Sequence, residues 1–366
     1  SDVAAAPAMD ELRKLTKSVR VMHIPPGTKR WRQIVAVARG RSYRLTAFTS
    51  DPMQEAIDET LARDDCDAVL IEGSTMAGYR LPPNVTCVLN EHNLEYELLE
   101  RQSRTEGPKW RKFYYRLEAR RALRVELQRC ARAALLLVTS ERERRILQER
   151  VPMRPIRVVP NGVDTAEWRI EGFEPLIPRR IVFTGRMDYY PNHQAALFFA
   201  RHCWPLVRAR VPEATWDIVG ASPAAAVTEL GKRPGITVTG WVDDVRPYLA
   251  RAALVVVPLL AGSGTRLKIL QALAMQKAVV STPIGCEGLA LEPGKHLEIG
   301  DGPAELAGSV VRLLNDPTRA AAMGAAGRAL VESTYTWQEV GSHLLQALDD
   351  IVQRDPTGED VCSEGP

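Results

Sequence analysis

Two kinds of segment are missing from this sequence of 366 residues. No apolar run approaches the length of a membrane span, and no cysteines form a CxxC pair, which argues against a disulfide framework or a zinc site. The six cysteines are scattered: Cys66, Cys87, Cys130, Cys203, Cys286 and Cys362. The formal net charge of +3 is too small to indicate nucleic acid as a partner. The length and the 45% share of hydrophobic residues predict a globular protein of two domains.

The most informative stretch covers residues 254–289 and has the pattern strand, glycine-rich loop, helix, strand. A helix that follows such a loop presents free N–H groups and the positive end of its dipole. Lys268 lies about one turn into this helix, and Arg266 precedes it by two residues. The pattern favours a diphosphate site. The alternative is an ordinary crossover with solvated basic residues. The spacing matches neither a Walker loop nor the GxGxxG fingerprint, so it does not by itself identify the ligand.

Helices and strands alternate along the first half of the chain, the pattern of a doubly wound parallel sheet. The expected helices cover residues 7–17, 29–39, 51–62, 94–133 (with a break at 107–108) and 141–150. The expected strands cover residues 19–24, 44–48, 67–71, 85–89, 135–138 and 156–159. Such a domain usually opens with a strand, a glycine-rich turn and a helix. This chain instead begins with a helix and reaches its first expected strand at residue 19, so we expect that the N-terminal domain lacks the usual first unit.

The second half repeats the alternation and predicts a second Rossmann-like domain. The expected strands cover residues 180–184, 215–219, 236–239, 254–257, 278–280 and 296–299, and the main helices 191–210, 267–274, 303–315, 317–333 and 336–353. We therefore predict an N-terminal domain over 1–165, a linker over 166–179, a C-terminal domain over 180–335, a helix over 336–354 that packs back towards the N-terminal domain, and a disordered tail over 355–366.

Two side chains at strand ends are candidates for chemistry. Arg186 follows a strand-ending glycine and can reach a phosphate with its planar guanidinium, although a surface pair with Asp188 would explain it too. His92 follows another strand, close to Glu91, and such a histidine can act at a reacting centre. A structural, hydrogen-bonded histidine is the alternative for His92.

Residues 101–150 are strongly basic, with fifteen Lys/Arg against six Asp/Glu. Most such stretches are solvated helix faces with ion pairs four residues apart. The alternative is a surface for an anionic membrane or an anionic acceptor.

Six motifs, in this order, together make a specific pattern. They are HNLEYE (92–97), PNGVD (160–164), FTGRMDYYPN (183–192), TGWVDDVRPYL (239–249), VVPLLAGSGTRLKILQALA (256–274) and STPIGCEGL (281–289). With them the chain resembles a retaining glycosyltransferase of family 4. The resemblance implies the B-type fold, in which two Rossmann-like domains face a cleft.

The resemblance also implies roles for particular residues. It assigns catalytic roles to His92, which would face the transferred sugar, and to Arg186 and Lys268, which would hold the diphosphate. The remaining positions would bind the sugar nucleotide: Gly185, Gly240, Val242, Ser263, Gly264, Thr265 and Gln271. Ser263 and Gln271 stand where the family has two carboxylates, so the sugar and ribose contacts depart from the family pattern.

The implied function is transfer of a hexosyl unit from a sugar nucleotide to an acceptor hydroxyl, with retention of anomeric configuration and without a protein nucleophile. We expect no metal and no cofactor, and a UDP-sugar rather than a GDP-sugar as donor. The acceptor would be a saccharide, a lipid-linked sugar or a small molecule, and the site of action the cytoplasm or the inner face of the membrane. Two alternatives remain: a non-catalytic sugar-nucleotide-binding partner protein, and a sugar-nucleotide epimerase of the same fold.

Overall fold

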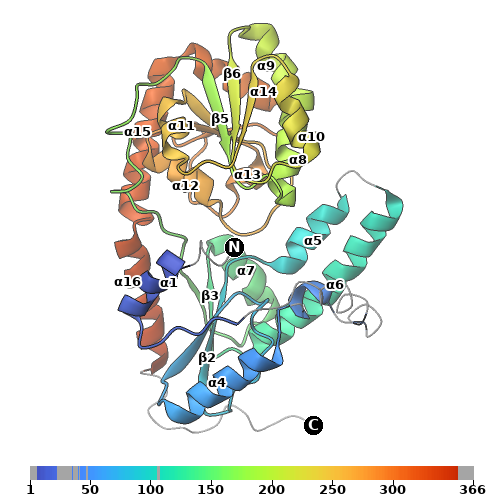
Figure 1. Ribbon diagram of the computed structural model, residues 1–366, viewed down its shortest axis with the longest axis vertical. Coiled ribbons are helices and arrows are strands. Elements are labelled where there is room, and N and C mark those ends of the chain that lie inside the picture. The colour runs from blue at the N-terminus through green and yellow to red at the C-terminus, as the bar shows by residue number, and fades with distance from the viewer. Residues whose placement is uncertain are drawn as a thin grey trace.

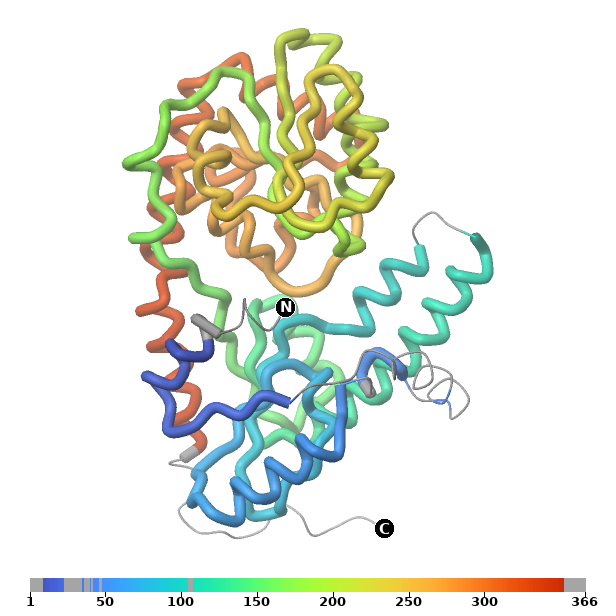
Figure 2. The backbone as a smooth tube through the Cα atoms, viewed as in Figure 1, coloured from blue at the N-terminus to red at the C-terminus, as the bar shows by residue number. Residues whose placement is uncertain are grey.

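The computed structural model describes residues 6–22, 35, 40, 42–46, 48–104 and 108–352. In this part of the chain, two parallel sheets with flanking helices form the two halves of an elongated molecule (Figure 1). The backbone passes between the halves twice, both times along the same side (Figure 2). The predicted class, α/β with two Rossmann-like domains, is confirmed.

The N-terminal sheet has four parallel strands in the order β1-β2-β3-β4. They are β1 (Ala68–Glu72), β2 (Thr86–Glu91), β3 (Leu135–Val138) and β4 (Ile156–Val158). The helices of this half are α1 (Ala6–Leu15), α3 (Tyr43–Thr46), α4 (Asp51–Arg63), α5 (Glu95–Arg104), α6 (Lys109–Arg132) and α7 (Glu141–Arg150). One sheet face places Leu89 and Leu136 in the same core as Ala119 and Ala122 of α6. Because β3 is buried throughout, both sheet faces are covered.

The C-terminal sheet has six parallel strands in the order β10-β9-β8-β5-β6-β7. They are β5 (Arg180–Thr184), β6 (Thr215–Val219), β7 (Ile236–Gly240), β8 (Leu254–Val257), β9 (Ala278–Ser281) and β10 (Glu298–Ile299). The strand order reverses between β5 and β8. Ligands of open parallel sheets bind at the carboxyl ends of the strands beside such a reversal.

Helices surround this second sheet. They are α8 (Tyr190–Phe198), η1 (a π-helix, Phe199–Cys203), α9 (Trp204–Arg210), α10 (Ala225–Thr228), η2 (Glu229–Lys232), α11 (Arg246–Arg251), α12 (Leu267–Ala274), α13 (Pro283–Cys286), α14 (Pro303–Asn315), α15 (Pro317–Thr334) and α16 (Trp337–Val352). None of the helices in the described ranges has both the length and the apolar character that a bilayer span requires.

Helix α16 belongs to the C-terminal end of the chain but packs on the N-terminal sheet. Its residues Val340 and Ala347 share a core with Leu135 and Leu137 of β3. At its first turn, the ring of Trp337 lies so close to Gly162 that a Cβ there would be 2.8 Å from the ring. Glycine in the PNGVD motif therefore lets the two halves of the chain meet at α16.

Two predicted strands near the N-terminus are wrong. The described part of segment 19–24 is not in a strand, and its residue Val21 is 61% exposed. Residues 44–48 were predicted as a strand, but helix α3 covers Tyr43–Thr46. Both segments are rich in apolar residues, but the described part of the first lies at the surface, where Arg20 pairs with Glu59 of α4. In the second, Leu45 is buried as part of helix α3. The predicted helix over 29–39 lies almost entirely outside the described residues.

Candidate functional site

Strands β5 and β6 end in two glycines that touch each other. Gly185 and Gly220 have φ angles of +147° and +143°, and a Cβ on Gly220 would collide with the Gly185 carbonyl. The N–H of Gly220 donates to the carbonyl of Gly240 at the end of β7, at 3.1 Å. The carboxyl ends of β5, β6 and β7 are thus held together by close backbone contacts that only glycine allows.

The loop between β8 and α12 is built around the buried side chain of Arg266. Its guanidinium donates to the carbonyls of Ser263 at 2.6 Å and of Gly264. A Cβ on Gly262 would lie 2.6 Å from the same guanidinium. Burial lowers the pKa of Arg266, which is only 7% exposed. The solvated role that the sequence left open for Arg266 is therefore not observed, because its donors fix the carbonyls of the glycine-rich loop.

Lys268 lies at the first turn of α12 and faces the exit of β5. Its Nζ donates to Oδ1 of Asn192 at 2.7 Å and lies 4.4 Å from the centre of the Phe183 ring. A Cβ on Gly185 would be 2.8 Å from this Nζ. Burial, together with the nearby charge of Arg266, lowers the pKa of Lys268 to about 7. The lysine is therefore held beside the strand exits, close to the carboxyl edge where a ligand would bind.

Arg186 takes a different position from Lys268. Its side chain is 73% exposed and forms a two-pronged ion pair with Asp188, at 3.1 and 2.7 Å. The structure therefore shows the surface pair that the sequence left open as the alternative. Its carbonyl also accepts a hydrogen bond of 2.9 Å from Asn192, the residue that holds Lys268.

His92 follows β2 and reaches the other domain through its backbone. Its Nε2 lies 2.5 Å from a carboxylate oxygen of Glu72, which ends β1. This contact with Glu72 raises the pKa of His92, so the charged imidazolium is favoured. The His92 carbonyl faces Gly264 so closely that a Cβ on Gly264 would collide with it. The segment after β2 thus docks against the glycine-rich loop.

Ser263 and Thr265, predicted to bind the donor, make contacts between the domains. The Ser263 hydroxyl accepts a hydrogen bond of 2.9 Å from the backbone N–H of Leu94. The Thr265 hydroxyl lies 2.5 Å from Nδ2 of Asn161 in the PNGVD motif. In the amide orientation that suits its neighbours, Asn93 donates to the Ser263 carbonyl at 2.6 Å. These polar contacts hold the loop between β8 and α12 against the N-terminal domain.

Four charged residues form an ion-pair cluster across the same interface. Glu287, between α13 and β10, bonds Arg101 of α5 at 2.7 Å and Arg142 of α7 at 2.9 Å. Both arginines also pair with Glu97 of α5. Sequence reasoning missed this cluster and assigned its two arginines only to a basic stretch. The STPIGCEGL motif could have indicated the cluster, because it places the carboxylate of Glu287 directly after a strand and a short helix.

The remaining predicted positions lie along the same edge of the C-terminal sheet. Gly240 ends β7 with φ of +71°, and Val242 in the following loop packs partly against the core. Gln271 lies on α12, one turn after Lys268, and is partly buried. No cluster of three or more histidine, cysteine, aspartate or glutamate side chains suited to a metal ion occurs among the described residues. The expectation of a metal-free reaction stays a prediction.

Two family models match the chain, one for each half. Residues 11–167 match the model described as Glycosyltransferase Family 4, and residues 178–316 match Glycosyl transferases group 1.

Curated relatives resemble part of the chain. A GDP-mannose-dependent alpha-(1-6)-phosphatidylinositol monomannoside mannosyltransferase from Mycobacterium tuberculosis is 30% identical over 159 residues, which is 39% of this chain and 41% of the relative. A GDP-mannose-dependent monoacylated alpha-(1-6)-phosphatidylinositol monomannoside mannosyltransferase from Corynebacterium glutamicum is 35% identical over 86 residues, 23% of each chain. The matches therefore span less than half of these relatives' length.

Solved structures share the fold at low sequence identity. Sucrose-phosphate synthase from Thermosynechococcus elongatus superposes with a TM-score of 0.64 at 19% identity, over 83% of this chain and 78% of that one. Anabaena Alr3699/HepE, in complex with UDP and glucose, gives a TM-score of 0.62 at 15% identity over 81% of each chain. At these identities the likeness supports the two-domain architecture alone.

Proposed function

The chain belongs to glycosyltransferase family 4, and from this premise we propose that it transfers a hexosyl unit from a nucleoside diphosphate sugar to an acceptor hydroxyl, with retention of anomeric configuration. The observation that carries the proposal is the position of Lys268. This lysine stands at the first turn of α12, beside the reversal of strand order, and faces Gly185. An ammonium group and helix N–H groups in that place suit a diphosphate.

The proposed chemistry is a front-face displacement that uses no protein nucleophile. The C–O bond between the sugar and the diphosphate breaks while the acceptor oxygen bonds to the same carbon. The acceptor proton passes to the leaving diphosphate. Lys268 and the first N–H groups of α12 would stabilise the charge that develops on the diphosphate. His92, whose imidazolium is favoured by Glu72, would face the sugar from the other domain.

The donor base has two candidates. The family resemblance implies a UDP-sugar, while the two curated relatives are named as GDP-mannose-dependent enzymes. We therefore propose a nucleoside diphosphate sugar and leave the base to a direct comparison of UDP-glucose with GDP-mannose.

A surface on α6 supports a membrane-associated acceptor. Trp110 and Phe113, three residues apart at the start of this helix, are each 70% exposed, and Lys109, Arg111 and Lys112 lie around them. Aromatic rings beside basic residues suit the interface of an anionic bilayer. We propose peripheral contact of this end of α6 with such a membrane, tested by vesicle sedimentation of a Trp110→Ser/Phe113→Ser variant, which should bind less than the parent.

The test of the transferase proposal is turnover with a donor panel. The purified chain is incubated with UDP-glucose or GDP-mannose, with and without lipid and sugar acceptors, and the anomeric configuration of any product is determined by NMR. Release of nucleotide with an anomer-retained product supports the proposal. An inverted product, or epimerised nucleotide sugar without transfer, contradicts it.

A second candidate function follows from Ser263 and Arg186. The Ser263 hydroxyl is engaged by Leu94 and the Arg186 guanidinium by Asp188, so two groups predicted to hold the donor are occupied within the protein. This favours a sugar-nucleotide-binding protein without turnover. Such a protein would gain thermal stability from UDP or GDP and release no nucleotide from the sugar donors.

A further inference from the structure

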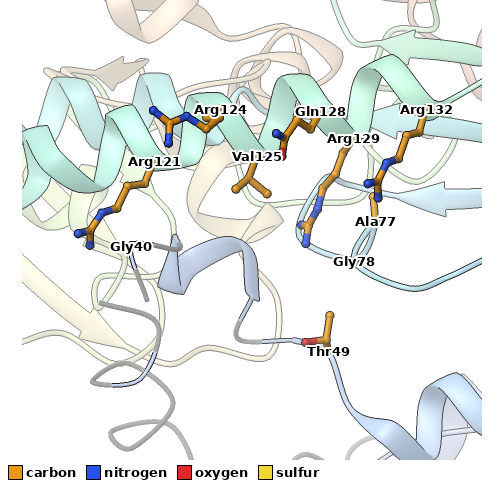
Figure 3. Close-up of a pocket in the computed structure, with 10 residues that line it drawn as sticks. All are labelled: Gly40, Thr49, Ala77, Gly78, Arg121, Arg124, Val125, Gln128, Arg129 and Arg132. Atoms are coloured by element: carbon orange, nitrogen blue, oxygen red, sulfur yellow. The ribbon is translucent and has the colours of Figure 1, made fainter. Parts of the chain in front are cut away.

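A pocket of about 540 Å³ lies on the N-terminal domain, outside the site described above. Helix α6 forms one wall, and Thr49 and the short segment Ala77–Gly78 stand opposite (Figure 3). None of the residues assigned to the donor lines this pocket. It therefore needs an explanation of its own.

The wall that α6 contributes is a row of arginines. Arg121, Arg124, Gln128 and Arg132 follow one another at intervals of three or four residues, which places them on one face of the helix. Figure 3 shows Arg121, Arg129 and Arg132 extending from the helix towards the side on which Thr49 lies. Four guanidinium groups in one pocket repel one another unless an anion lies between them.

Arg129 is fixed in place by helix α3 and by the loop after β1. Its Nη1 donates to the carbonyl of Leu45 at 2.9 Å and to the carbonyl of Ser74. Gly78 allows this approach, because a Cβ there would lie 2.8 Å from Nη2 of Arg129. One guanidinium of the pocket is thus pre-organised beside Gly78, and its position does not depend on a ligand.

Three of the arginines have no carboxylate partner. Among the described residues, no aspartate or glutamate lines the pocket, and no ion pair joins Arg121, Arg124 or Arg132 to a carboxylate, whereas the charges of Glu91 and Glu126 act on Arg129. The glutamates of α6 are committed elsewhere. Glu118 accepts from Ser42 at 2.7 Å, and Glu126 accepts from the backbone N–H of Glu95 at 2.8 Å.

We propose that this pocket binds a phosphate-bearing anion, with the guanidinium groups of Arg121, Arg124, Arg129 and Arg132 as its donors. Arginine matches phosphate geometry with two parallel N–H bonds, and several arginines around one cavity suit a group with more than one negative charge. The phosphate can belong to a soluble molecule or to a lipid headgroup, because the recognition chemistry is the same.

Calorimetric titration with inorganic pyrophosphate, at low salt, tests the soluble source. The titration is done on the Lys268→Ala background, which weakens binding at the donor site and so reduces its contribution. Sedimentation with phosphatidylcholine vesicles, with and without phosphatidic acid, tests the lipid source. Both measurements report binding directly and do not depend on transferase activity.

Two variants and one control identify the pocket as the site. Arg124→Gln/Arg132→Gln removes two exposed donors, and Gln128→Glu places a carboxylate between them while keeping every arginine. Each should weaken binding by about tenfold or more. Arg120→Gln removes an exposed arginine of the same helix that does not line the pocket, and it should bind like the parent. Unchanged thermal unfolding of the variants excludes misfolding.

Pyrophosphate binding that both variants weaken and the control keeps supports the proposal with a soluble ligand. Binding only to vesicles that contain phosphatidic acid, with the same dependence on the variants, supports it with a lipid headgroup. Absence of both kinds of binding, or variants that bind as well as Arg120→Gln, overturns it.

Discussion

The Nζ of Lys268 donates a hydrogen bond of 2.7 Å to Oδ1 of Asn192, and this bond joins the first turns of α12 and α8. Asn192 is 7% exposed and donates in turn to the carbonyl of Arg186. The two helices begin after β8 and β5, the strands on either side of the reversal in strand order. The bond therefore fixes the amino group of Lys268 at the edge where the fold binds ligands.

Lys268→Ala should lower kcat/KM for the preferred nucleotide sugar at least about tenfold, equivalent to about 1.4 kcal/mol of transition-state stabilisation. The expected loss follows from removing the ammonium that would face the leaving diphosphate. Steady-state kinetics with the best donor of the panel measures it. Lys295→Ala is the matched control, since Lys295 pairs with Glu292 at the surface of the same domain. Equal activity in the two variants would contradict the assignment of Lys268.

Nucleotide binding should be coupled to proton uptake at Lys268. Its pKa of about 7 lies below the ordinary lysine value of 10.5, so at about pH 8 most molecules hold it neutral. A bound diphosphate favours the ammonium form and raises this pKa, so the complex takes up a proton. Titration of UDP and GDP in two buffers of different ionisation enthalpy measures the uptake. Lys268→Arg, charged at every working pH, should show none.

The same lysine gives stability a pH dependence of known sign. Because the folded pKa lies below the unfolded one, the unfolded state binds more protons between about pH 7 and pH 10.5. The free energy of unfolding contributed by Lys268 should therefore rise with pH across this window. Denaturant unfolding of the parent and of Lys268→Met at several pH values measures the difference. A difference that falls as pH rises would contradict the burial of the ammonium.

Gly264→Ala should separate the glycine-rich loop from the N-terminal domain. A Cβ there would collide with the carbonyl of His92 and the side chain of Asn93. Gly172→Ala is the control, because Gly172 has a similar φ of +87° and no heavy atom within 4 Å of its Cβ position. Both substitutions carry backbone strain of about 1–2 kcal/mol, so any further loss of thermal stability in Gly264→Ala reports the contact between domains. Equal losses would show that this contact contributes nothing.

Sequence patterns predicted the sheets well where burial decides the structure. The continuous apolar runs of β3 and β8 gave their bounds correctly, because strands covered on both faces contain little else. The bounds of β5 and β6, which are mainly apolar, were also predicted correctly. Helix α7 was also predicted at its full length, with Ser140 accepting from the N–H of Glu143 at its start. Segment 19–24 failed because its apolar residues do not form a buried run, as the 61% exposure of Val21 shows. Residues 44–48 failed because Leu45 is buried from a short helix and not from a strand.

The residues that contact each other across the interface between the domains could not be predicted. The sequence predicts that Ser263 binds the sugar nucleotide with a shorter side chain than the family carboxylate. In the structure its hydroxyl accepts a hydrogen bond from the N–H of Leu94, 169 residues earlier in the chain. The sequence leaves open a solvated, basic role for Arg266. In the structure its guanidinium donates hydrogen bonds to three backbone carbonyls around it. The spacing of apolar residues along the sequence predicts helices and strands. It does not identify which residue of the other domain a given side chain will contact. Contacts between domains therefore had to come from the structure.

Glu287→Gln should weaken the association of the two domains. The amide keeps the shape of Glu287. Among the described residues it leaves Glu97 as the one ion-pair partner of both Arg101 and Arg142, whose side chains are 14% and 28% exposed. Because these groups are largely shielded from water, we expect a loss of about 1–2 kcal/mol in the free energy of unfolding.

Denaturant unfolding measures the loss, and small-angle scattering measures any increase in the radius of gyration. Glu292→Gln is the control, because its pair with Lys295 lies at the surface, where solvent screens it. A Glu287→Gln protein as stable and as compact as this control would show that the cluster does not hold the domains together. In that case the hydrogen bonds of Ser263 and Thr265 would have to hold the interface instead.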